Sequence, residues 1–390
     1  MGLAMELRVP AAAVHFPEED RRWLLERIDE ILQSGRLTLG PYTRTLEEEF
    51  AALCGRRYAV ATASGTAALE IALRAIGVAG REVVVPANTF FATAAAVLHA
   101  SGVPRFVECE PAALALDPEA LEGAIGPRTA AVIVVHIGGI VSPHIEHIAD
   151  ICRRAGVTLV EDAAHAHGSS YLGRPAGSFG LAAAFSFYPT KVVTSGEGGM
   201  LVTDDEAIYR EALVYRDQGK ERFDSNRHVR LGYNWRMSEV HAAIGLAQVR
   251  RLPGFIAHRR HIAAVYDREL AALAPHLVPV REPEGARSNY YKYICWLRGL
   301  PRDLLKARLR ERYGVALSGE VYDLPCHRQP CFASWDPGPL PVAEEICASH
   351  ICLPISARMT EDDAAYVCWA LRRAIAELLA EGHGGEGPCA

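Results

Sequence analysis

The sequence Glu161-Asp162-Ala163-Ala164-His165-Ala166-His167-Gly168, followed by Phe185-Ser186-Phe187-Tyr188-Pro189-Thr190-Lys191, decides the fold of this 390-residue chain. An apolar run, Val157-Thr158-Leu159-Val160, leads into the two carboxylates, which is how a buried parallel strand delivers an acid to the ligand-binding edge of an α/β sheet. A second apolar run, Ala182 to Phe187, carries Ser186 near its end, and Lys191 follows. The pattern predicts a carboxylate, a hydroxyl and an amine at one sheet edge.

Pyridoxal phosphate chemistry requires these three side-chain types. A carboxylate such as Asp162 keeps the pyridine nitrogen protonated, an amine such as Lys191 forms a Schiff base, and hydroxyls such as Ser186 donate to the phosphate. Taken alone, an Asp after a strand is often a helix cap, and most lysines are solvated surface residues. The combination favours a pyridoxal phosphate site.

Short apolar strands alternate with helical stretches, which predicts an α/β fold with a mostly parallel seven-stranded sheet sandwiched by helices. The expected strands are Tyr58–Thr62, Glu82–Pro86, Val103–Val107, Ala130–Val135, Val157–Glu161, Ala182–Ser186 and Met200–Thr203. The expected helices are Glu18–Ser34, Gly65–Ile76, Phe91–Ser101, Pro118–Ile125, Ile145–Ala155 and Glu206–Gln218.

We expect two domains, as the usual size of a domain suggests for a chain of this length. The large cofactor-binding domain covers residues 1–250, and a smaller α+β domain covers residues 251–381. The expected elements of the smaller domain are a bridging helix over Leu252–Leu273, a strand over Tyr291–Leu297, and helices over Asp303–Tyr313 and Glu361–Glu381. The glycine-rich residues 382–390 are expected to be disordered.

The composition argues against several partners. A formal net charge of −6 and a sequence pI near 6.2, with scattered Lys and Arg, offer no basic field for nucleic acid. No apolar run approaches the roughly 18 residues of a membrane span. The start of the chain lacks a basic segment followed by an apolar one, so we expect a cytoplasmic enzyme.

Ten cysteines are spread along the chain, mostly within apolar runs, and we interpret them as reduced core residues. Two clusters resemble metal ligands superficially, Cys326-His327 with Cys331, and Cys347 with His350 and Cys352. Neither repeats a paired C-x₂-C pattern, so no metal site is predicted.

Other candidate cofactor contacts lie at the ends of the first two strands. Ser64-Gly65-Thr66 opens a helix, whose N-terminus binds phosphate through free N–H groups, although an ordinary Ser cap explains the same residues. Phe90 can lie on the face of the pyridine ring, while Phe91 is expected in the core.

Two histidines follow Asp162. His165 can turn back to the phenolic oxygen of the cofactor, or can simply be a packed polar residue, whereas His167 is expected to support the Asp162 carboxylate from behind.

The chain resembles the DegT-type (DegT/StrS) sugar aminotransferases, which are pyridoxal phosphate enzymes of the aspartate aminotransferase fold, or fold type I. The matching motifs run through most of the chain. They are Gly35…Leu39-Gly40-Pro41, Ser64 to Leu69, Glu161 to Gly168, Gly177-Ser178-Phe179-Gly180, Phe185 to Lys191, Glu197-Gly198-Gly199, Arg216 to Gly219, Gly232 to Met237 and Tyr322…His327. Several spaced motifs in this order are far more specific than any one of them.

The resemblance implies roles at the matching positions. Lys191 is similar to the family's Schiff-base lysine and proton carrier, and Asp162 to the partner of the pyridinium nitrogen. Gly65 and Thr66, with Ser64 and Ser186, resemble the phosphate ligands, Phe90 the stacking ring, and His165 occupies a position that is often glutamine. Asn234 matches an asparagine that reaches the phosphate in the neighbouring subunit, which implies a homodimer.

The resemblance also implies the reaction. L-glutamate converts the cofactor to pyridoxamine phosphate, which then aminates a nucleotide-linked ketosugar in deoxyaminosugar and natural-product biosynthesis. A dTDP-4-keto-6-deoxyglucose type substrate, aminated at C4, is the leading hypothesis, with C3 amination next. Lys220, Arg230 and His327 are candidates for binding its diphosphate, and surface charge is their alternative explanation.

Other substrates and roles stay open. Related enzymes aminate a cyclitol ketone of the scyllo-inosose type or form an aminobenzoate-type unit. A sugar dehydratase is disfavoured because Lys191 is present where some relatives have histidine. A pyridoxal-binding regulatory protein is the remote alternative, although no additional DNA-binding segment or basic patch supports it.

Overall fold

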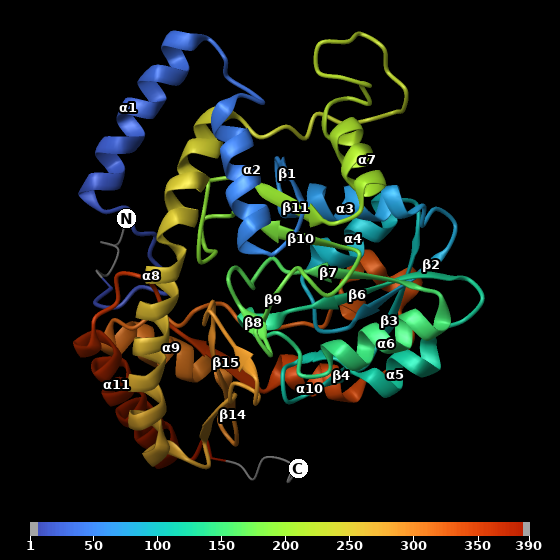
Figure 1. Ribbon diagram of the computed structural model, residues 1–390. Helices are drawn as coiled ribbons and strands as arrows, with labels where there is room; N and C mark the ends of the chain where they lie inside the picture. The colour runs from blue at the N-terminus through green and yellow to red at the C-terminus, as the bar shows by residue number, and fades with distance from the viewer. Residues whose placement is uncertain (1–6, 385–390) are drawn as a thin grey trace.

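The computed structural model describes residues 7–384 and places seven strands in one central sheet (Figure 1). The strands are β1 Tyr58–Thr62, β2 Glu82–Pro86, β3 Val103–Val107, β6 Thr129–Val135, β7 Thr158–Asp162, β10 Ala182–Ser186 and β11 Gly199–Thr203. They lie in the order β1-β11-β10-β7-β6-β2-β3, and within this sheet β11 runs antiparallel to both neighbours while the other pairs are parallel. The predicted fold class is confirmed.

Helices cover both faces of this sheet. One buried cluster packs residues of α2, α5, α6 and the first half of α8 on one face, and a second cluster packs residues of α3, α4 and α7 on the other. The helices are α1 Glu18–Ser34, α2 Pro41–Leu53, α3 Gly65–Ile76, α4 Phe91–His99, α5 Pro118–Ala124, α6 Ile145–Ala155, α7 Glu206–Arg216 and α8 Glu239–Leu270.

Because helices cover both faces of the sheet, its strands are continuous apolar runs rather than alternating apolar and polar residues. Along β2, Val83 and Val85 belong to the cluster under α3 and α4, whereas Val84 belongs to the cluster on the opposite face. Successive side chains of a strand point to opposite faces, so a sheet covered on both sides needs apolar residues at every position.

The smaller part of the molecule is built on a three-stranded antiparallel sheet in the order β12-β14-β15. Its elements are β12 Leu277–Pro279, β14 Tyr293–Leu297, β15 His350–Leu353, α9 Arg302–Tyr313, α10 Pro341–Ala348 and α11 Glu361–Ala380. The second half of α8 packs into its core together with α9 and α11. Figure 1 shows α8 running from beside α2 down to this smaller part.

Short elements complete the structure. The remaining strands are β4 Cys109–Glu110, β5 Ala115–Leu116, β8 Ser170–Tyr171, β9 Arg174–Pro175 and β13 Ala286–Arg287. The 3₁₀ turns are η1 Ile137–Gly139, η2 Ala271–Leu273, η3 Cys326–Arg328 and η4 Pro330–Trp335. Because β13 pairs with β8, the segment that leads into the small sheet is also tied to the loop after β7.

The structure differs from the sequence expectations mainly around α8. This helix begins at Glu239 rather than Leu252, so it crosses the boundary expected after residue 250. The helix α2 had no counterpart among the expected elements. Of the expected disordered tail, residues 385–390 lie outside the described part of the chain.

Three further sequence expectations concern cysteines, metals and membranes. The nine cysteines of the described part are free, and all except Cys331 are buried. Among residues 7–384, no group of His, Cys, Asp and Glu side chains is arranged to hold a metal ion. The same residues contain no helix that combines the length and apolar character needed to cross a membrane.

Candidate active site

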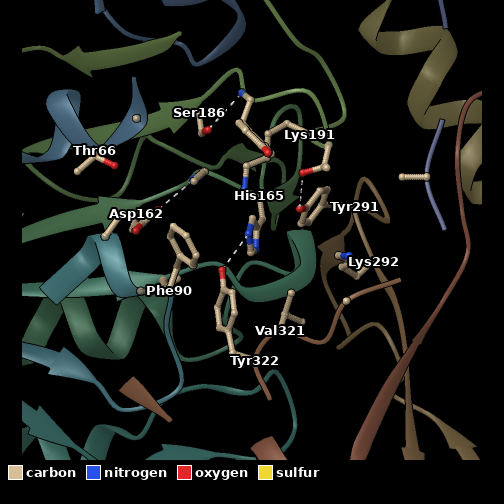
Figure 2. A pocket seen from close by; sticks show the side chains of 18 of the residues that line it. Thr66, Phe90, Asp162, His165, Ser186, Lys191, Tyr291, Lys292, Val321 and Tyr322 are labelled. Atoms are coloured by element: carbon tan, nitrogen blue, oxygen red, sulfur yellow. Dashed lines mark hydrogen bonds between the residues drawn. The ribbon is translucent and has the colours of Figure 1, made fainter. Parts of the chain in front are cut away.

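A cavity of about 660 Å³ opens at the ends of β7 and β10, next to the start of α3. The large part of the molecule contributes Asp162, His165, Ser186 and Lys191 to its wall (Figure 2). The opposite wall comes from the smaller part and is formed by Tyr291, Lys292, Ser318, Glu320 and Tyr322. The N-terminal segment covers one side, since Ala11 lines the cavity and accepts a hydrogen bond of 2.8 Å from the Ser318 hydroxyl.

Asp162 is the last residue of β7 and presents its carboxylate to the cavity. The hydroxyl of Thr93 donates to Oδ2 at 2.7 Å, and the Ala164 N–H donates to Oδ1 at 3.2 Å. The Thr93 hydroxyl is itself 2.7 Å from that of Thr89. These contacts from α4 and from the loop after β7 fix the orientation of the carboxylate, and no basic side chain among residues 7–384 forms an ion pair with it.

The adjacent Glu161 is fully buried, and its carboxylate binds neighbouring backbone groups rather than facing the cavity. Its carboxylate accepts hydrogen bonds from the backbone N–H groups of Gly177, Phe179 and Gly180 and lies 3.0 Å from Nε2 of His136. Burial alone would raise the pKa of Glu161, but these hydrogen bonds outweigh it and lower the pKa. Neighbouring residues of a strand face opposite ways, so the Glu161 carboxylate binds the loop of residues 177–180 and the Asp162 carboxylate faces the cavity.

Lys191 reaches the cavity from the loop after β10. Its Nζ lies 4.9 Å from the centroid of the Tyr291 ring. Burial lowers the pKa of Lys191 to about 8, although the charge of Asp162 acts in the opposite direction. An appreciable fraction of the amine is therefore neutral near pH 7, and a neutral amine is the form that attacks a carbonyl group.

The start of α3 forms the other end of the cavity. Ser64 caps this helix by accepting a hydrogen bond from the Ala67 N–H at 3.1 Å, and Ser64, Gly65 and Thr66 line the cavity with Ser186. A Cβ on Gly65 would lie 2.9 Å from Cβ of Ser186, so only glycine lets the helix N-terminus approach β10 so closely. The Ser64 cap is thus present, and the free N–H groups of the same helix start leave it suited to a phosphate.

Phe90 and His165 complete the cavity wall. Phe90 precedes α4 with 54% of its surface exposed, and its ring centroid is 5.7 Å from that of Tyr322. The Gly138 N–H donates to Nδ1 of His165 at 3.3 Å, and Nε2 lies 3.2 Å from the Tyr322 hydroxyl. Burial and the nearby Lys191 hold the pKa of His165 well below its usual range. The ring is therefore neutral, and its Nε2 carries the proton, since Nδ1 accepts a hydrogen bond.

Three expected residues lie elsewhere in an exposed segment between α7 and α8, which extends away from the body of the molecule in Figure 1. Asn234 is exposed and pairs with Asp217, Lys220 lies 5.9 Å from the Phe223 ring, and Arg230 forms an ion pair with Glu211. None of the three expected residues lines this cavity.

Other expectations are not met by the structure. His327 is fully buried in η3, where its Nε2 is 3.3 Å from Glu344, and it does not line the cavity. His167 packs among phenylalanine rings, and neither of its ring nitrogens has a partner in the described residues, so it does not support Asp162. Phe91, expected in the core, remains 46% exposed.

Sequence reasoning missed the wall contributed by the smaller part. The backbone N–H of Tyr322 donates to Oδ1 of the fully buried Asn88 at 3.0 Å, and the Asn289 amide donates to the carbonyls of His165 and His167. These contacts hold Tyr322 and the Tyr291 segment over the sheet edge. One sequence signal could have indicated this wall. It is the aromatic run Asn289-Tyr290-Tyr291-Lys292-Tyr293.

Comparison with known proteins identifies the family. The model of the DegT/DnrJ/EryC1/StrS aminotransferase family matches residues 18–372. The chain belongs to this family. Members are pyridoxal phosphate-dependent, and the chain is accordingly a pyridoxal phosphate-dependent sugar aminotransferase.

Three relatives illustrate the range within this DegT-type family. The chain is 36% identical to a pleiotropic regulatory protein of Geobacillus stearothermophilus over 349 residues, which are 88% of this chain and 92% of that protein. It is 38% identical to L-glutamine:scyllo-inosose aminotransferase of Streptomyces griseus over 317 residues, 76% of this chain and 73% of that one. The crystal structure of DesI in the presence of its TDP-sugar product has a TM-score of 0.87 at 33% identity, covering 97% of this chain and 96% of DesI.

The residues of the aminotransferase cavity fit pyridoxal phosphate. The helix start with its glycine approach at Gly65 suits the phosphate, Asp162 suits a protonated ring nitrogen, and Lys191 suits the aldehyde carbon. When bound, the cofactor supplies an electron sink for cleavage of a bond at the carbon that bears the amino group. With the cofactor in place, Asp162 would hold a negative charge against the ring nitrogen, Lys191 would carry a proton to and from the reacting carbon, and neutral His165 would donate a hydrogen bond from Nε2.

The pKa of Lys191 leads to a prediction for cofactor uptake. Cofactor-free aminotransferase should take up pyridoxal phosphate faster as the pH rises, with a midpoint near 8, because the neutral amine reacts. Stopped-flow absorbance between pH 6 and 10 measures this rate. The Asp162→Asn variant should move the midpoint lower, since the Asp162 charge raises the pKa of Lys191. A midpoint near 10, the ordinary value for lysine, would contradict the assignment.

Proposed function

We propose that this aminotransferase moves the amino group of L-glutamate to a nucleotide-linked ketosugar, with C4 of a dTDP-4-keto-6-deoxyhexose as the first candidate position. The observation that carries the proposal is the placement of Lys191 and Asp162 in one cavity with the N-terminus of α3, which suits a phosphate. The cavity of about 660 Å³ is within the usual range for small-molecule sites. The likeness to DesI, crystallised with a TDP-sugar product, supports a nucleotide-linked acceptor.

Other acceptors and roles follow from other relatives. The scyllo-inosose aminotransferase supports a cyclitol ketone as the second candidate and L-glutamine as a second donor. C3 amination of a nucleotide sugar and an aminobenzoate-type product remain alternatives on the same scaffold. Because one relative is named a pleiotropic regulatory protein, the experiment also tests a regulatory role. The presence of Lys191 and Asp162 in one cavity favours catalysis.

The decisive experiment pairs amino donors with acceptors. The purified protein with bound cofactor is incubated with L-glutamate or L-glutamine, and then with dTDP-4-keto-6-deoxyglucose, a 3-keto isomer or scyllo-inosose. Mass spectrometry and NMR identify the aminated product and its ring position. We expect the 4-amino dTDP-sugar; amination of scyllo-inosose alone would replace the proposal with the cyclitol reaction, and cofactor that stays unchanged with every donor would favour the regulatory role.

We further propose that the enzyme is a homodimer in which Asn234 completes the neighbouring subunit's site. Asn234 lies in the exposed segment and does not line the cavity of its own chain. Lys220 and Arg230 share that segment, so the same arrangement would bring them to the substrate of the neighbouring subunit. Exposed apolar side chains occur on α1 (Leu25, Leu32), in the loop after it (Leu37) and in the segment between α7 and α8 (Phe223, Leu231), as expected for surfaces that a second copy covers.

Mixed dimers test this arrangement. Homodimers of Lys191→Ala and of Asn234→Ala should both be impaired, whereas a heterodimer with one copy of each should regain activity. In that heterodimer one site combines Lys191 from one copy with Asn234 from the other, both unaltered. If Asn234 served its own chain's site, both sites of the heterodimer would carry a defect and no activity would return. Differently tagged copies, co-expressed and purified in sequence, provide the sample.

A further inference from the structure

Lys292 places an unpaired positive charge in the cavity. It follows Tyr291 at the end of the segment that leads into β14, and it lines the cavity while its side chain is largely shielded from solvent. No carboxylate of the described residues forms an ion pair with its ammonium group, although ion pairs are common elsewhere in the molecule. A buried charge is costly unless it is paired, so this position points to an anionic ligand.

The groups around Lys292 strengthen this conclusion. Glu320 is the carboxylate of the cavity wall on this side, but both its oxygens are bonded to Lys306, at 2.7 and 2.8 Å. Arg259 of α8 is fully buried and donates to the carbonyls of Tyr290 and Ile355 rather than to a carboxylate. The cations Lys292, Arg259 and Lys306 therefore have a single nearby carboxylate among the described residues, that of Glu320. Burial, together with the charges of Arg259 and Lys306, lowers the pKa of Lys292, although the charge of Glu320 acts in the opposite direction.

The position of Lys292 excludes the cofactor phosphate as its anion. Figure 2 shows Lys292 on the side of the cavity away from Thr66, at the helix start that suits the phosphate. Both lysines lie near the ring of Tyr291, with Nζ of Lys191 4.9 Å and Nζ of Lys292 5.3 Å from its centroid. The two amines therefore share one ring as a neighbour, and the charge of Lys292 contributes to the lowered pKa of Lys191. The Asn289 hydrogen bonds to the loop after β7 fix this placement.

We propose that Lys292 binds the amino-donor amino acid through one of its carboxylates, with the α-carboxylate as the first candidate. This inference rests on the proposed function. The α-carboxylate of an amino acid is attached to the carbon that carries the reacting nitrogen, so a cation beside Lys191 is within its reach. The diphosphate of a nucleotide sugar is several bonds from a C3 or C4 ketone and carries more charge than one ammonium group balances. The carboxylate is therefore the better match.

The test uses Lys292→Met, which keeps the length of the side chain and removes its charge, and Lys292→Arg, which keeps the charge. With cofactor bound, the KM for L-glutamate in the donor half-reaction should rise about 10- to 100-fold in Lys292→Met, with partial recovery in Lys292→Arg. Equal losses for L-glutamine identify the α-carboxylate, whereas a loss confined to L-glutamate identifies the side-chain carboxylate. Cofactor absorbance and the unfolding temperature should match the unaltered protein.

Two further measurements make the test independent of turnover with the donor. Calorimetric binding of glutarate, an unreactive dicarboxylate, should weaken by a similar factor in Lys292→Met. The reverse half-reaction from an aminated sugar, which has no carboxylate, should keep its KM. A rise in the KM for the sugar with unchanged values for L-glutamate and glutarate would overturn the proposal in favour of diphosphate binding. Absence of any donor reaction in the unaltered enzyme would contradict the proposed function, while glutarate binding would still decide the role of Lys292.

Discussion

Lys191→Ala is expected to abolish transamination and to remove the absorbance that the covalently bound cofactor gives the protein. The side chain supplies both the amine that bonds to the cofactor and the group that moves the proton at the reacting carbon. Proton transfer by one positioned side chain contributes up to about 10⁴-fold to a rate, so turnover should fall by at least that factor. Turnover with L-glutamate and the absorption spectrum measure the two effects separately.

A conservative variant distinguishes the reactivity of the Lys191 amine from the effect of its positive charge. Lys191→Arg keeps a cation beside Tyr291, but a guanidinium stays protonated and cannot attack a carbonyl group or accept the proton. It should therefore be as inactive as Lys191→Ala, with an unfolding temperature close to that of the unaltered protein. A Lys191→Ala protein that keeps its absorbance and its turnover would remove Lys191 from the mechanism.

Asp162→Asn should leave cofactor binding largely intact and lower kcat by roughly 10²–10³-fold, the loss typical when one preorganised electrostatic contact is removed. The amide preserves the shape of the side chain; its oxygen can accept from the Ala164 N–H while its NH₂ group donates to the Thr93 hydroxyl, but it no longer holds the ring nitrogen in its protonated form. Single-turnover absorbance measurements with L-glutamate report the chemical step, and equilibrium titration with pyridoxal phosphate reports binding. Unchanged single-turnover kinetics would rule out this role.

The neighbouring carboxylate provides a matched comparison. Glu161 sits one position earlier on β7, but its partners are His136 and the backbone of residues 177–180. Glu161→Gln should chiefly lower the unfolding temperature, because the amide offers a weaker acceptor to buried donors. The two substitutions on one strand should therefore separate stability from catalysis.

Much of the sheet was predictable because its strands are buried on both faces and read as uninterrupted apolar runs. The bounds of β1, β2, β3 and β10 agree with the sequence expectation, and those of β6, β7 and β11 differ by one residue. The residues at the strand ends followed from the same logic. Asp162, Ser186 and the start of α3 come together because parallel strands present their carboxyl ends at one edge.

The opposite wall of the cavity was not predictable in the same way. Tyr291, Lys292 and Tyr322 reach the site only because α8 carries the chain from one core to the other, and no local pattern encodes that packing. The expectation that His327 would lie at the substrate is not met for a related reason. A motif fixes which residues are near one another along the chain, but the turn η3 directs this ring toward Glu344.

One consequence of α8 concerns movement. Up to Ile256 most of its buried apolar residues belong to the core of the sheet, apart from Ala243 and Ala247, which pack against α1, and from Ile262 they belong to the core of the smaller part. Pro253 lies inside this helix, a few residues before the change of core, and proline cannot donate an N–H to the preceding turn. We therefore expect α8 to bend most easily near this junction. Because Tyr291 and Lys292 belong to the smaller part, a bend there would change the distance between these residues and Lys191.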